Sequence, residues 1–179
     1  MKNKLRNIIK EEINNLLSEK EEVFVPHDLE GRKEKRLQQI YRMLQQKHIE
    51  GDLDLNGTDI TSLGKLESIS GYLYLCNTKI TSLENLKEVG GNLNLQKTPI
   101  TSLGKLKEVG GSLWLANTPI TSLGNLAEVK WNLWLDNTPI TSLVNLKEVG
   151  GVLWLDTTPN LSWNDIPEHL RNKVIGKDK

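Results

Sequence analysis

The chain has 179 residues, with 23 Lys and Arg against 23 Asp and Glu and a single cysteine, Cys76. A formal net charge of zero gives no electrostatic basis for binding nucleic acid, and no apolar run reaches the ~20 residues of a membrane span, so we expect neither partner. The lone cysteine excludes an internal disulfide and fits a reducing compartment, so we expect a cytoplasmic protein.

Residues 1–20 are predicted to form an amphipathic helix. Leu5, Ile9, Ile13 and Leu16 share one face, while Lys and Glu occupy the other. Because a lone helix of this length is marginal in water, it needs a surface to pack on. That surface is the rest of the chain, a second copy of the helix, or a partner protein.

Residues 21–50 are predicted to contain a link and an N-terminal capping helix. Residues 21–26 form the link, and Asp28 is a suitable N-cap for a helix that runs to about His48. The apolar stripe of this helix consists of Leu37, Ile40, Tyr41 and Leu44. Since the helix directly precedes a repeat region, we expect it to cover the first repeat.

Residues 51–160 consist of six copies of one 20-residue unit. The unit is clearest at 111–130, GSLWLANTPITSLGNLAEVK, and further copies begin at 51, 71, 91, 131 and, with more changes, 151. A fixed period of this length predicts a solenoid in which each repeat is one coil that packs on its neighbours. We therefore predict a β-solenoid of about six coils with one parallel β-sheet face.

The spacing of apolar residues within the unit predicts how one coil is built. Leu113 and Leu115 flank Trp114, so the two leucines face one side of a strand and the tryptophan faces the other. Steps of three follow, which predict a turn and a loosely helical or polyproline-like return through Ile120, Leu123, Leu126 and Val129. A repeat of α-helices is rejected because proline interrupts the middle of the unit at Pro99, Pro119 and Pro139.

Two further columns have a structural interpretation. A threonine follows the strand in every unit, and its hydroxyl is expected to bond to the backbone of the bend; these residues are Thr58, Thr78, Thr98, Thr118, Thr138 and Thr158. Paired glycines such as Gly90–Gly91 and Gly110–Gly111 precede the strand, where we expect a backbone conformation that other residues resist.

The string LKEVGGSLWLANTPITSL, residues 106–123, resembles a leucine-rich repeat. It departs from the usual repeat at Thr118, where asparagine is the rule, and its extra residue at the Val109-Gly-Gly corner is similar to the L domains of receptor ectodomains. The short unit, and IIKEEINNLLSE at 8–19, also resemble segments of repeat proteins of tailed bacteriophages. The resemblance implies a solenoid that binds proteins on its sheet face, located in a host cytoplasm or a virion.

Residues 161–179 are predicted to form a C-terminal cap and tail. SWNDIPEHLRNKV, residues 162–174, predicts a short helix that begins with a Ser162 or Asn164 cap and carries Pro167 early. Trp163 is expected to cover the last coil, and the polar tail from Gly176 is expected to fray.

The outward strand positions vary between repeats, and they carry the candidate binding site. Aromatic residues gather there, toward the C-terminal half of one face, and stacking at ~4.8 Å aligns three tryptophans in a row. The predicted partner-binding residues are Tyr72, Tyr74, Asn94, Trp114, Trp131, Trp134, Asp136, Trp154 and Asp156. One interpretation is that the rings only stack on each other and stiffen the sheet. The other is that the exposed aromatic patch is a contact site.

Several functions remain open at this point. The preferred hypothesis is a non-catalytic module for protein–protein interaction or for self-association as a homodimer. The alternative is glycan binding, with sugar rings on the Trp row and hydroxyls bonded by Asp136, Asp156, Asn132 and Asn94. No catalytic triad, metal-ligand cluster or phosphate loop is discernible, so we expect no enzyme, no metal and no cofactor. Ice binding, which some β-solenoids with threonine arrays perform, is not favoured, because Thr121 and Ser122 give one outward hydroxyl row rather than a flat double array.

Overall fold

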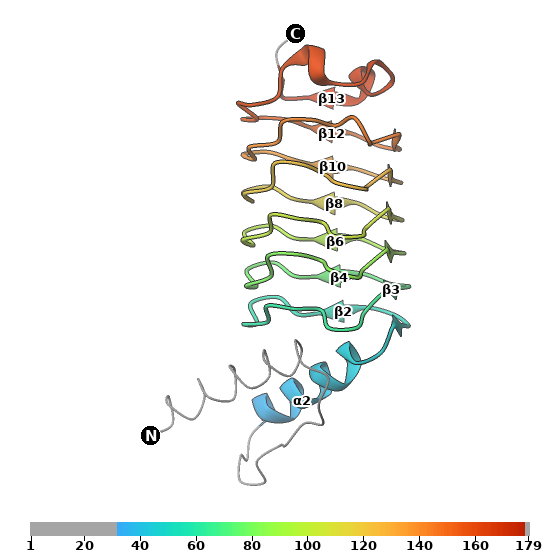
Figure 1. Cartoon of the computed structure of the whole chain (residues 1–179), viewed down its shortest axis with the longest axis vertical. Coiled ribbons are helices and arrows are strands. Elements are labelled where there is room, and N and C mark those ends of the chain that lie inside the picture. The colour runs from blue at the N-terminus through green and yellow to red at the C-terminus, as the bar shows by residue number, and fades with distance from the viewer. Residues whose placement is uncertain (1–31, 178–179) are drawn as a thin grey trace.

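The protein is a parallel β-solenoid of about six coils with 20-residue spacing (Figure 1). The computed structural model describes residues 32–177. The predicted helix over residues 1–20 and the predicted N-cap at Asp28 lie outside the described residues.

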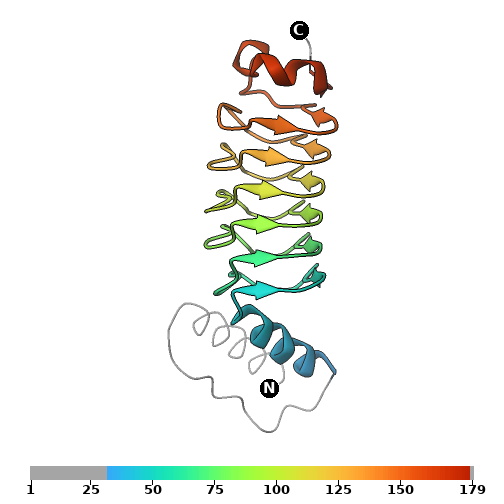
Figure 2. The same ribbon diagram turned by 90° about the vertical axis from the view of Figure 1, so that its right-hand side faces the viewer.

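Each of the first five coils contributes one two-residue strand to each of two parallel sheets, and the sixth coil contributes a strand to one of them. Sheet A contains β1 (His48–Ile49), β3 (Ser68–Ile69), β5 (Glu88–Val89), β7 (Glu108–Val109), β9 (Glu128–Val129) and β11 (Glu148–Val149). Sheet B contains β2 (Leu53–Asp54), β4 (Leu73–Tyr74), β6 (Leu93–Asn94), β8 (Leu113–Trp114), β10 (Leu133–Trp134), β12 (Leu153–Trp154) and β13 (Val174–Ile175). Figure 2 shows both stacks side by side.

The prediction of a single sheet face was wrong. Val129, which was assigned to an irregular return, lies in β9 and pairs with Val149 of β11. The physical reason is the length of the strand. Two residues, one outward and one inward, are too few to show the alternation of a strand, so Val129 looked like one more apolar residue in a series spaced three apart. The predicted L-x-L strand, by contrast, is present as sheet B.

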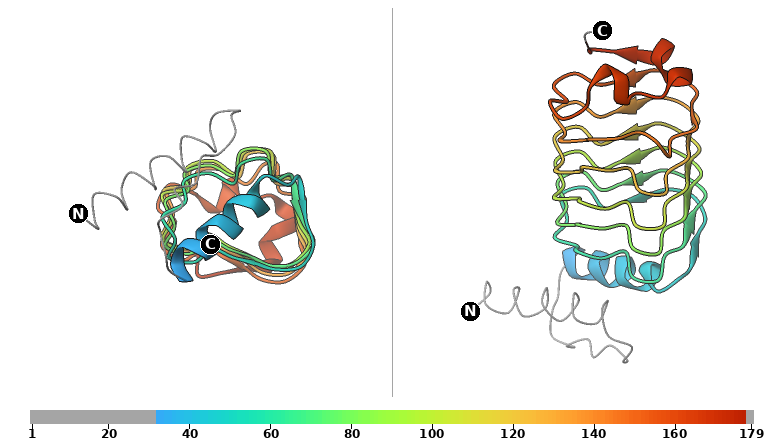
Figure 3. Two further views of the ribbon diagram at one scale, coloured as in Figure 1. Left: turned by 90° about the horizontal axis from the view of Figure 1, so that it is seen from below. Right: turned by 45° about the horizontal axis from the view of Figure 1, so that its top comes forward.

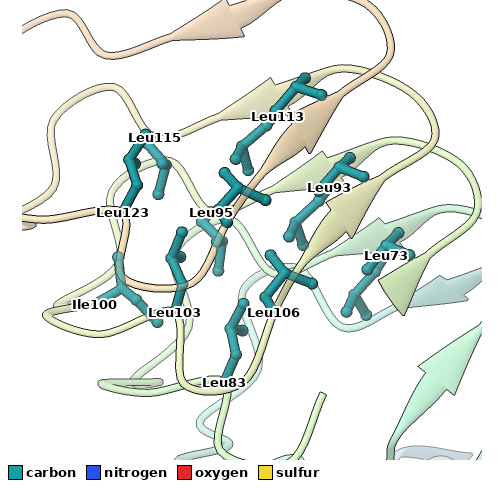
Figure 4. Packing of buried hydrophobic residues seen from close by; sticks show 14 of the residues in the cluster. Leu73, Leu83, Leu93, Leu95, Ile100, Leu103, Leu106, Leu113, Leu115 and Leu123 are labelled. Carbon is teal, nitrogen blue, oxygen red and sulfur yellow. The ribbon is translucent and has the colours of Figure 1, made fainter. Parts of the chain in front are cut away.

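Apolar columns fill the space between the two sheets (Figure 4). Leu113 and Leu115 are fully buried, whereas Trp114 between them is only half-buried, as the alternation predicts. In sheet B each inward leucine stands in register with the leucine of the next coil, as Leu113 does with Leu133. The coils superpose closely when viewed along the axis, so the residue columns run nearly straight (Figure 3).

The threonine column has the structural role that was predicted. The Oγ1 of Thr118 donates to the carbonyl oxygen of Leu115 at 2.7 Å, and the same bond recurs in the other five coils. The bend itself is left-handed at the preceding residue, with φ of 60° at Asn117 and 54° at Asn137. Asparagine tolerates this region better than most residues do.

The corner glycines serve close packing rather than an unusual backbone. Among the residues with positive φ, neither Gly90 nor Gly110 occurs. A Cβ on Gly110 would instead lie 2.2 Å from the carbonyl oxygen of Gly90, because the stacked backbones approach closely at this corner. The expectation of a special glycine conformation was therefore wrong, although the need for small residues was not.

Helix α2 (Arg32–Leu44) lies across the N-terminal end of the stack (Figure 3). Ile40 and Leu44 are buried and belong to the same apolar core as the coils. The helix does not extend to His48 as predicted, because His48–Ile49 forms β1 and pairs with β3. Ile49 is buried, so the inward requirement of sheet A outweighs the helical pattern at this point.

The C-terminal segment lies at the other end of the stack (Figure 1). Two 3-10 helices, η1 (Trp163–Asp165) and η2 (Glu168–Lys173), precede β13, which pairs with β12. Ser162 is the N-cap of η1, with a capping box to Asp165, and Trp163 is partly buried against the core. The sequence did not predict β13, whose two residues were assigned to the cap.

Candidate functional site

Sheet B places the predicted aromatic residues on its outward face. Tyr74, Asn94, Trp114, Trp134 and Trp154 each occupy the second position of a strand, and each pairs with its equivalent in the adjacent coil. All five side chains are half-buried. The predicted alignment of one outward row is therefore confirmed.

Trp114 and Trp134 stack on each other within this row. Their ring centroids are 4.8 Å apart, and the planes differ by 6°. Parallel rings at this distance remove one face of each indole from contact with solvent. The interpretation that the rings stiffen the sheet is thus supported for this pair.

The two tyrosines form a separate group. Tyr72 and Tyr74 meet edge to face at 6.0 Å and an interplanar angle of 74°, and Tyr72 is 42% exposed. Asn94 stands in the row between Tyr74 and Trp114, and its Oδ1 accepts a hydrogen bond from the backbone of Gln96. The predicted residues therefore comprise a tyrosine pair in coil two and tryptophans in coils four to six.

Trp131 differs from the other tryptophans. It lies at the corner between β9 and β10 and is 66% exposed. The equivalent residues of the neighbouring coils, Gly111 and Gly151, have no side chain that could cover the indole. At this position a large apolar side chain replaces glycine, although the other coils form without any side chain there.

The two carboxylates beside the row have different environments. Asp136 is half-buried, and loss of solvent raises its pKa, although backbone hydrogen bonds from Asp156 and Asp136 itself partly oppose this shift. Its Oδ1 is inaccessible and has no hydrogen-bond partner. Asp156 is exposed. Asp156 is therefore the more accessible of the two carboxylates.

Sheet A carries an outward row of glutamates that the sequence did not single out. Glu88, Glu108, Glu128 and Glu148 stand in register on β5, β7, β9 and β11. Lys130 forms an ion pair with Glu128 and lies 3.9 Å from Glu108, and these carboxylates raise the pKa of Lys130. The signal was visible as the recurring E-V dipeptide, but it could not be interpreted without knowing that this dipeptide is a strand.

Within residues 32–177, no group of three or more His, Cys, Asp or Glu side chains is arranged to hold a metal ion. In the same part of the chain, every helix is too short or too polar to cross a bilayer. Comparison with protein-family models, with curated proteins and with solved structures finds no match. Function therefore has to be inferred from the geometry of the chain itself.

Proposed function

We propose that the protein is a non-catalytic binding module that uses the aromatic outer face of sheet B for protein–protein interaction, including self-association. The contact residues would be the exposed and half-buried aromatic side chains described above, with Asp156 at the margin. Trp and Tyr dominate the energetics of protein interfaces, and water-exposed aromatic clusters on monomers commonly mark such interfaces.

The exposure of Trp131 carries this proposal. Stacking accounts for Trp114 and Trp134, but no packing role accounts for an indole that is 66% exposed where other coils have glycine. A side chain of this size in water is unfavourable for the free protein, and it is explained if a partner covers it.

Glycan binding is less well supported by the same geometry. The mutual stacking of Trp114 and Trp134 covers ring faces on which sugars would lie. The Oδ1 atoms of Asn94 and Asn132 already accept backbone hydrogen bonds, from Gln96 and Val152. A sugar ring could still stack on Trp131, so a glycan array belongs in the test.

We also infer that α2 and the C-terminal 3-10 helices act as end caps, since both contribute buried side chains to the core. A leucine-rich-repeat type, a phage origin and a cytoplasmic location remain predictions from sequence.

The test compares the full chain with the Trp131→Gly variant, which installs the residue of the other coils. Val144→Gly is the matched control, because Val144 is 76% exposed at another corner of the coil that carries Trp131. Self-association is measured by light scattering after size exclusion. External partners are identified by capturing bound proteins in parallel with each of the three proteins. We expect Trp131→Gly, and not Val144→Gly, to lose a bound protein or the dimer. Identical association and identical captured proteins in all three would contradict the proposal.

A further inference from the structure

We propose that the partner is a second copy of this chain, bound through sheet B in an antiparallel arrangement about a two-fold axis between β6 and β8. This inference rests on the proposed function and names its partner. It follows from the distribution of aromatic side chains along the solenoid and from the straightness of the rows.

The aromatic side chains are placed so that the face is complementary to itself. A two-fold axis parallel to the strands, between β6 and β8, brings coil five of one copy against coil two of the other. Trp131 then stands opposite Gly71 of the second copy, one residue from Tyr72, and Trp134 meets Tyr74. Because the contact is isologous, both pairs occur twice.

The straight stack allows these contacts to form together. Coils related by 20 residues superpose closely along the axis, so the outward rows do not spiral away from a facing copy (Figure 3). The two most exposed aromatic residues of the described chain, Trp131 at 66% and Tyr72 at 42%, would lie one residue apart across the interface. Each is the more exposed member of its own aromatic group.

The rest of the face has no opposed like charges in this arrangement. At the last position of the outward face, Asp136 meets Cys76 of the second copy, and Asp156 meets Asn56. Trp154 meets Asp54, and Trp114 meets Asn94. With the two-fold axis along the solenoid instead, each coil would face its own copy, so Asp54 would face Asp54, which is unfavourable.

The area of the face predicts a weak dimer. Six strands of sheet B, β2 to β12, face a strand of the second copy. At ~4.8 Å for each strand their length is about 29 Å, and the six residues from corner to corner give a width of about 17 Å, so each copy offers about 490 Å². The total of about 1,000 Å² lies at the lower limit for a specific interface. We therefore expect dissociation in the micromolar range or weaker, with the aromatic contacts dominating the affinity.

Cys76 allows a direct test of the arrangement. In an Asp136→Cys variant, the new thiol would face Cys76 of the second copy across a sheet-to-sheet distance of ~10 Å, which bismaleimidoethane can bridge. Within one chain the two thiols lie three strand spacings apart, about 14 Å, which is too far for this reagent. The substitution fits locally, because the equivalent residue in coil two is Cys76 itself.

The full chain is sedimented at concentrations from about 10 µM to about 1 mM, where a weak dimer populates. We expect the wild type to dimerise without cross-linking, and Asp136→Cys to give a dimer joined between positions 76 and 136. Adding Trp131→Gly should raise the dissociation constant about tenfold or more and reduce the cross-link in proportion. A Val144→Cys variant, whose thiol lies on another corner, should not cross-link.

Three outcomes would overturn the inference. A wild type that remains monomeric throughout would exclude the second copy, while loss of an external partner in Trp131→Gly would leave the proposed function standing. Cross-linking of wild type through Cys76 alone would show a different arrangement. A dimer of Asp136→Cys that fails to cross-link would show that sheet B is not the contact.

Discussion

Replacing both members of the Trp114–Trp134 stack with valine should reveal a favourable coupling between them. Valine keeps the preference for a strand and removes the aromatic contact. Aromatic pairs in this geometry contribute about 1 kcal/mol beyond the area that they bury, so the double variant should lose about 1 kcal/mol less than the sum of the single variants. The structure supplies the reason, since the rings are parallel to within 6° at 4.8 Å.

Urea unfolding followed by circular dichroism measures this coupling. With a slope of about 2 kcal/mol per molar urea, a coupling of about 1 kcal/mol corresponds to a shift of about 0.5 M in the midpoint. Tyr74 and Trp154 provide the control pair, because they share the row, lie four coils apart and do not face each other in the proposed dimer. Their substitutions should be additive within about 0.3–0.5 kcal/mol. Equal additivity for Trp114 and Trp134 would refute a stabilising stack.

Three other predictions concern the coil. Hydrogen bonds from Lys87 and Lys47 lower the pKa of Glu67 to about 2. A lowered pKa stabilises the fold at pH values above the ordinary pKa of 4.5, so the difference in urea midpoint between wild type and Glu67→Gln should shrink as the pH falls from about 4.5 to 2. A difference that stays constant with pH would contradict this. Thr118→Val removes the hydroxyl bond to a buried carbonyl and should cost about 1 kcal/mol in urea unfolding, whereas no loss would mean that the bend does not need the bond. Gly124 has φ of 58° and open space where a Cβ would project. Gly124→Ala should therefore lower the free energy of unfolding by about 1 kcal/mol, measured by thermal or urea unfolding, and Gly124→Asn should lower it less. Equal losses for the two variants would show that backbone conformation is not the cause.

The sequence predicted the strand of sheet B and the bend after it, because the same residue type recurs there in every unit and its preference for a buried or a turn position is strong. Leu113 and Leu115 face inward and Trp114 outward because alternation over three residues already specifies a strand. Thr118 was correctly assigned to the bend, since a hydroxyl next to a turn has a nearby backbone partner. The period itself fixed the number of coils.

Sheet A could not be predicted because it depends on stacking rather than on local pattern. Glu128 and Val129 form a strand only because identical pairs lie above and below them. The same holds for His48, which a helical pattern placed in the capping helix although it pairs with Ser68. Tertiary pairing outweighs local preference when a strand has only two residues.

The candidate site was predicted as a set but not as an arrangement. The row of tryptophans follows from the period, whereas the difference between Trp114, which is stacked, and Trp131, which is exposed, depends on side-chain orientation. The inaccessibility of Asp136 Oδ1 likewise depends on neighbouring coils that a sequence does not position.

Because the register is uniform, the number of coils sets the distance between two positions along the solenoid axis. Trp131 stands a fixed number of coils above α2, and each coil adds the same strand spacing of ~4.8 Å. Removing one internal repeat, such as residues 71–90, would join equivalent positions and shorten this height by a single step. Duplication or loss of whole repeats can therefore change the reach of the protein along its axis without redesigning the core, while each repeat gained or lost also adds or removes its own outward residues.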